Sequence, residues 1–132
     1  MGKKCCNEFL DAALNYLKTN GSTLVVCKGE PDTYANAIST VTYQVGIIAY
    51  TTGSGDYTGP ADSTVAGGGR MLTMAGKSGI VVNSTGVADH VAMVDADLTT
   101  LIYVTTCTSQ TVNSTSNTLT VSSWVISIAD PT

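Results

Sequence analysis

Short runs of β-branched and apolar residues, separated by Gly, Asn, Asp and Ser, fill most of this chain. Between Gly79 and Cys107 three such runs follow one another, joined by the turn sequences Asn83–Gly86 and Asp95–Asp97. Runs of roughly four to eight such residues between turn formers are typical of strands, and three strands with short connections predict an antiparallel meander. We therefore expect this stretch to form the centre of a β-sandwich or barrel.

Further strand-like runs lie on both sides of this meander. They are Ser22–Lys28, Val41–Tyr50, Arg70–Ala75, Thr118–Val121 and Ser123–Ala129. Together with the meander they predict a mainly β fold, an antiparallel β-sandwich or barrel of about eight strands. Gly46 lies inside the second run and indicates a β-bulge there.

The segments between these runs are rich in turn-forming residues. Thr51–Ala66 contains repeated Gly, Ser and Thr and predicts a surface loop, and the three glycines at 67–69 predict a flexible turn. Thr33–Ser39 has no clear period, and we interpret it as an irregular or short helical segment. Asp95 and Asp97 lack the remaining ligands of a calcium loop, so we expect them to cap their turn.

From Cys5 to Thr19 the pattern changes to a helical period. The apolar residues of this segment form one stripe: Phe9, Leu10, Ala13, Leu14 and Leu17. Asn7 is a candidate N-cap, and Asn20-Gly21 supplies a helix stop. We therefore expect one N-terminal amphipathic helix. Two interpretations of its stripe stay open, because it can pack on the domain's own sheet or dock on a neighbouring subunit.

The length and the charge of the chain limit its organisation and its partners. With 132 residues it is expected to form a single domain over 1–132, the helix lying in 1–20 and the β-sandwich or barrel in 21–132. Charged residues make up 12% of the chain against about 25% in average domains. The net charge of −4 and the scattered basic residues argue against a nucleic-acid partner. No apolar run approaches the roughly 18 residues that indicate a membrane span, so we expect no membrane partner.

Sparse charge is also typical of the cores of protein interfaces. Two tyrosines flank the Gly-rich loop, and aromatic side chains are frequent interface anchors. We therefore expect the surface to be used in assembly. The predicted interface residues are Phe9, Leu10, Leu14, Leu17, Tyr50 and Tyr57.

The chain carries few residues that could perform catalysis. His90 is the only histidine, and strand alternation predicts that Asp89 and His90 point in opposite directions and do not form a dyad. Cys107 could act as a thiol nucleophile near His90, but we expect both Cys27 and Cys107 to be buried as small hydrophobic residues. We therefore predict no enzyme activity, no catalytic residues, no metal site and no cofactor.

Several segments together carry a resemblance to a known group of proteins. They are the N-terminal amphipathic helix, Leu24–Pro31 followed by Thr33–Ala35, Gly86–Val94, Leu101–Cys107 and the ending Trp124–Thr132. In these segments, over nearly its whole length, the chain resembles small structural proteins encoded by tailed bacteriophages. The resemblance implies a component of the virion and not an enzyme.

Within that resemblance we expect a capsid decoration (cement) protein that stabilises the head shell. Its implied partners are the major capsid protein and itself, as a homotrimer, and its implied location is the capsid surface of the virion after synthesis in the host cytoplasm. A head–tail connector or a tail component is the alternative. A carbohydrate-binding module at the virion surface is a third interpretation, for which a single tryptophan in a predicted core strand is weak support.

Overall fold

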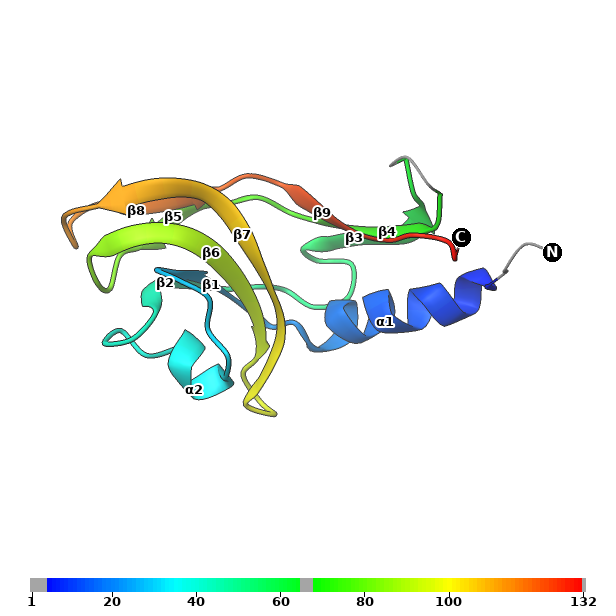
Figure 1. Cartoon of the computed structure of the whole chain (residues 1–132), viewed down its shortest axis with the longest axis horizontal. Helices are drawn as coiled ribbons and strands as arrows, with labels where there is room; N and C mark the ends of the chain where they lie inside the picture. Colours follow the sequence, from blue (N-terminus) through cyan, green and yellow to red (C-terminus); the bar gives the residue numbers. More distant parts are fainter. Residues whose placement is uncertain (1–4, 65–67, 132) are drawn as a thin grey trace.

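A computed structural model describes residues 5–64 and 68–131 of the chain (Figure 1). Residues 1–4 and 65–67 lie outside the described residues, and so does the last residue; the gap takes in part of the predicted Gly-rich loop and turn. The helices and strands are α1 (Asn7–Asn20), β1 (Thr23–Cys27), α2 (Tyr34–Ala37), β2 (Gln44–Ala49), β3 (Tyr57–Asp62), β4 (Arg70–Met74), β5 (Lys77–Val81), β6 (Gly86–Asp95), β7 (Thr100–Val112), β8 (Thr118–Val121) and β9 (Trp124–Ile128). The predicted mainly β, antiparallel and sandwich-like class with one N-terminal amphipathic helix is confirmed, and the predicted short helical segment corresponds to α2.

The largest sheet has the strand order β2-β1-β6-β7, and every neighbouring pair is antiparallel. Its central strand β1 is buried on both faces, because one face meets the main core and the other meets α2. The α2 side is filled by Val25, Cys27, Ala92 and Val94 around Ala37. A strand that is covered on both faces has a continuous apolar sequence instead of an alternating one, and β1 has such a sequence.

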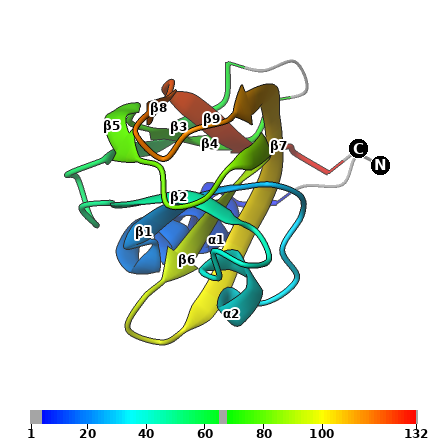
Figure 2. The same ribbon diagram turned by 90° about the vertical axis from the view of Figure 1, so that its left-hand side faces the viewer.

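The second layer consists of two smaller sheets, β3-β4-β9 and β5-β8. In Figure 1 these strands run along the upper side of the molecule, away from α2. Figure 2 shows β7 at one side of the larger sheet, near the strands of the second layer. The side chains between the layers form the main core, which includes Leu24, Leu72, Met74 and Met93.

The predicted three-stranded meander is wrong in one of its strands. β6 and β7 pair as expected, but β5 pairs with β8, and directly after β5 the residue Val82 forms an isolated antiparallel bridge with Gly46 of β2. A Cβ on Gly46 would lie 2.9 Å from the carbonyl oxygen of Val81, so only glycine allows this close approach. The ladder between β1 and β2 shifts register next to Gly46, which confirms the predicted bulge.

The predicted surface loop between Thr51 and Ala66 contains a strand, β3. Its sequence includes Gly59 and Pro60, two residues that usually interrupt strands. β3 lies at the edge of its sheet, where the missing N–H of a proline costs no ladder bond. The pairing with β4 is interrupted at these two residues and resumes at Ala61.

The helix α1 begins one residue earlier than the predicted N-cap implies. Cys6 is the N-cap residue and accepts from the backbone N–H groups of Phe9 and Leu10, and no side chain caps this end. The prediction that Asn7 is the N-cap is therefore wrong. At the other end the backbone N–H of Gly21 donates to Leu17, as expected for a helix stop.

Candidate functional site

Three of the predicted interface residues belong to the chain's own core. Leu10, Leu14 and Leu17 point from α1 toward the second layer and are buried there, Leu14 being only 2% exposed. The side chain of Asp11 fixes the same face, because its two carboxylate oxygens accept from the Arg70 guanidinium at 2.6 and 3.0 Å. Of the two interpretations of the helix stripe, packing on the domain's own sheets is therefore right for these leucines. Their assignment as contacts to a partner is wrong.

Tyr50 and Tyr57 are also core residues and not surface anchors. Their rings meet edge to face with centroids 5.6 Å apart, and Tyr57 is 2% exposed. The Tyr50 hydroxyl donates to the carbonyl of Ala75, and the Tyr57 hydroxyl donates to the carbonyl of Gly21. Burial raises the pKa of both phenols, so both remain neutral donors. Their assignment to an interface is wrong because Tyr57 begins a strand where the sequence predicted a loop.

Phe9 is the predicted interface residue that stays on the surface. Its side chain is 71% exposed, and Tyr16, two turns further along α1, is 49% exposed. Ala12 and Ala13 lie between them and are exposed as well. These four residues, spaced i, i+3, i+4 and i+7, form one continuous apolar strip that we call the α1 surface stripe. Sequence reasoning missed Tyr16, although this spacing is the signal that could have found it.

Asp89 and His90 contact each other, contrary to the prediction from strand alternation. The Asp89 Oδ1 lies 2.8 Å from the His90 Nδ1. Between β6 and β7 the register jumps from Ala88 opposite Gln110 to His90 opposite Thr106, so Asp89 sits at an irregularity where alternation fails.

The Asp89 carboxylate also holds a loop in place. The backbone N–H of Gly29 donates to the same Oδ1 at 2.6 Å, and Gly29 has a φ of +102°. The hydrogen bonds from His90 and Gly29 hold the pKa of Asp89 below its usual value. The pair therefore anchors the connection after β1 to β6.

The two cysteines of the larger sheet differ in exposure. Cys27 is buried, as predicted, and burial, with Asp89 and Cys107 adding to it, raises its pKa to about 12. Cys107 is exposed, so its predicted burial is wrong. Partial burial of the thiol and the charge of Asp89 raise the pKa of Cys107 as well. Both effects disfavour the thiolate, which is the reactive form of a cysteine nucleophile.

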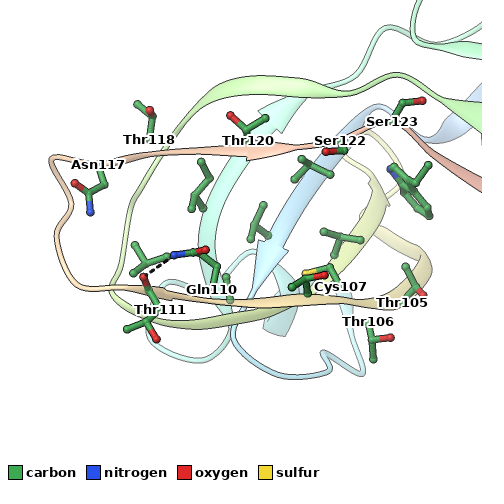
Figure 3. Close-up of a pocket in the computed structure, with 18 of the residues that line it drawn as sticks. Thr105, Thr106, Cys107, Gln110, Thr111, Asn117, Thr118, Thr120, Ser122 and Ser123 are labelled. Carbon is green, nitrogen blue, oxygen red and sulfur yellow. Dashed lines mark hydrogen bonds between the residues drawn. The ribbon is translucent and has the colours of Figure 1, made fainter.

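A groove of about 1000 Å³ lies between β7 and β8, on the open side of the two layers (Figure 3). β7 and β8 are joined by the short connection 113–117 but belong to different sheets. Gln110 and Cys107 lie between the two strands in Figure 3, whereas Thr118 and Thr120 point away from β7. Val26, Ala88 and Val91 contribute to the apolar lining.

None of the residues that line this groove is charged. At one end Trp124 stacks on Tyr103, with ring centroids 5.9 Å apart and an interplanar angle of 28°. The lining therefore offers no charged group for a phosphate, a carboxylate or a cation. Within residues 5–64 and 68–131 no group of three or more His, Cys, Asp or Glu side chains is placed to hold a metal ion.

Comparisons with protein-family models, with curated proteins and with solved structures each find no match to this chain. Among the described residues, neither helix is of a length and hydropathy that would let it cross a membrane.

Proposed function

We propose that this chain is a structural component of a tailed-bacteriophage particle that decorates the head shell and stabilises it. The phage particle enters this proposal through the sequence resemblance, which includes the segments that form β1, β6, β7 and the last strand. What supports an assembly role, as opposed to a chemical one, is the character of the surface. Its partners in this proposal are the major capsid protein and other copies of the same chain.

The observation that carries the proposal is the α1 surface stripe. Phe9 is the only phenylalanine of the chain and is 71% exposed on a helix whose leucines are all buried. Aromatic residues, phenylalanine among them, are enriched at protein interfaces relative to the rest of the surface. Residues 98–129, which include β7, β8 and β9, contain no charged residue, so this part of the surface loses little solvation of charge when a partner covers it.

Decoration stabilises a shell by adding buried contact area across subunits that would otherwise separate. A protein interface of standard size buries about 1,600 Å² in total, and each added interface raises the work needed to pull the shell subunits apart. A small rigid domain without a chemical step is sufficient for this role. Removal of the protein should leave the shell assembled but less resistant to internal pressure.

A comparison of particles with and without this protein tests the proposal. We expect particles that lack it to form and then to burst at lower temperature or lower salt than complete particles. Restoring the purified chain should restore their resistance. Equal stability of the two kinds of particle would contradict the decoration role.

A connector or tail location is the alternative, and copy number separates the two. Quantitative mass spectrometry of purified particles, calibrated on the major capsid protein, gives copies per particle. A shell protein should be present in on the order of hundreds of copies, whereas a symmetric ring at the portal or tail holds about a dozen or fewer. Absence from the particle would overturn the virion proposal.

A further inference from the structure

The groove between β7 and β8 is the opening of an incomplete barrel. The strands around it follow one another in the order β7-β6-β1-β2-β5-β8. Two contacts join β2 to the end of β5, since Val82 forms a bridge with Gly46 and the Asn83 N–H donates to a β2 carbonyl at 2.7 Å. Within the described part of the chain, no ladder joins β8 back to β7. A closed barrel has no strand edge, whereas this one has two.

The two edges form the walls of the groove. In residues 5–64 and 68–131, β7 pairs only with β6 and β8 pairs only with β5, so the second edge of each strand has no partner strand. β7 and β8 supply most of the lining and β5 supplies none, so the unpaired edges are the ones that border the groove (Figure 3). An unpaired edge presents a row of backbone N–H and C=O groups, and another extended backbone has the matching groups at the matching spacing.

These edges lack two features that usually prevent an exposed edge from pairing with another chain. Natural edge strands are often short, or carry lysine or proline. β7 is 13 residues long, and neither β7 nor β8 contains a charged residue or a proline. The ladder between β6 and β7 is irregular at 107–109, opposite Asp89, so a regular added strand would pair with only part of β7. Addition of a short strand is a known mode of peptide recognition at such an edge.

The lining of the groove restricts the side chains that an added strand can carry. Val26, Ala88 and Val91 form the apolar part of the lining, and each is at most 4% exposed. Side chains alternate along a strand, so every second residue of an added strand would point toward these three. A charged side chain there would be buried without a partner, because no residue of the lining is charged. The groove therefore fits a segment with uncharged, apolar residues at alternate positions.

We propose that the groove binds an extended, uncharged polypeptide segment of a partner protein, which adds a strand between β7 and β8 and closes the barrel. β8 has four residues, so pairing with both walls extends over about five residues of the segment. The proposal rests on the proposed function only in placing this segment on another protein of the particle. The contact is smaller than a standard interface, so we expect an affinity that is about micromolar or weaker.

Selection from a displayed library of random peptides of about seven residues tests the proposal on the isolated chain. We expect enrichment of peptides with uncharged, apolar residues at alternate positions. In a background with Cys5 and Cys6 replaced by serine, alkylating Cys107 with a bulky maleimide fills the groove and should abolish binding. The matched control is Thr120→Cys with Cys107 also replaced by serine. Thr120 is exposed on β8 and points away from β7, so alkylation there should leave binding unchanged.

Methylation of the peptide backbone tests the two walls separately. Successive N–H groups of a strand point to opposite sides, so one alternate set of N–H groups would face β7 and the other set would face β8. We expect N-methylation of either set to weaken binding at least about tenfold, because both sets donate to a wall.

Three results would overturn the proposal. They are a library with no enriched peptide, equal binding by the two alkylated proteins, and a peptide that tolerates N-methylation of one set. Because these measurements use the isolated chain and synthetic peptides, their failure would leave the particle-stability test of decoration unaffected.

Discussion

Tyr57 joins three parts of the chain that are far apart in sequence. It is the first residue of β3, its ring meets the ring of Tyr50 after β2, and its hydroxyl donates to the carbonyl of Gly21 at the end of α1. A buried carbonyl without a donor costs free energy, so this hydroxyl stabilises the packing of the helix end against the second layer. The contribution of the Tyr57 hydroxyl to stability can be measured separately from the contribution of its ring.

Tyr57→Phe removes only the hydroxyl and keeps the ring. We expect the free energy of unfolding to fall by about 1–3 kcal/mol, because the Gly21 carbonyl loses its donor in a buried site. Urea denaturation followed by circular dichroism measures the change. Tyr16→Phe, at a position 49% exposed, is the matched control and should change stability by less than about 0.5 kcal/mol. Equal effects of the two substitutions would contradict the role given to the Tyr57 hydroxyl.

Single residues also show where the sequence alone could not predict the direction of a side chain. Alternation along β6 predicted opposite directions for Asp89 and His90, but the side chains are 2.8 Å apart. The difference arises from the register jump between β6 and β7, which depends on how residues about twenty positions apart pair. By contrast, Asp95 caps its turn as expected, accepting from the backbone N–H groups of Asp97 and Leu98, because that interaction is local.

At the scale of elements, α1 was predictable as a helix, whereas the assignment of its apolar residues was not. Phe9 and Leu10 are neighbours in the same apolar pattern, yet Leu10 is buried and Phe9 is exposed. The pattern gives the width of the apolar surface, but the position of the sheet decides which part is covered. The same limit applies to β5, whose strand character was clear from the sequence and whose partner β8 was not.

The two sides of α1 should respond differently to truncation. Leu14→Ala removes a side chain that is 2% exposed in the core, and we expect it to destabilise the fold by about 2–5 kcal/mol. Phe9→Ala should leave the stability of the monomer within about 0.5 kcal/mol and should weaken self-association. Thermal unfolding at low concentration, compared with sedimentation at high concentration, separates these effects. A large loss of monomer stability in Phe9→Ala would show that Phe9 belongs to the core.

At the scale of the whole molecule, one ion pair connects the two sheets of the second layer. Asp56 immediately precedes β3, Lys77 begins β5, and their side chains are 2.7 Å apart. The Lys77 amine also lies 4.8 Å from the centre of the Tyr50 ring. Burial acts to raise the pKa of Asp56, but the hydrogen bonds from Lys77 and Thr51 outweigh it and hold the pKa below its ordinary value.

This ion pair should make stability depend on acidity. Because the pKa of Asp56 is lower in the folded chain than the ordinary 3.8, its contribution is present above that value and is lost as the pH falls through the lower, folded pKa. Asp56→Asn should lower stability at neutral pH and flatten the fall in the free energy of unfolding in this acidic range. Asp97→Asn, at an exposed position, serves as the control. A variant whose acid profile matches the parent chain would show that the pair contributes nothing.

The stack of Tyr103 and Trp124 is the point at which β7 meets β9, at the end of the groove between the two layers. Trp124 is the only tryptophan in the chain. When the indole is excited selectively over the tyrosines, the emission of the unlabelled protein therefore comes from a single, known junction. Any event that opens the layers there, or fills the groove beside the ring, changes the surroundings of the indole and therefore shifts the wavelength of its emission. Trp124 thus reports on this junction without an added label.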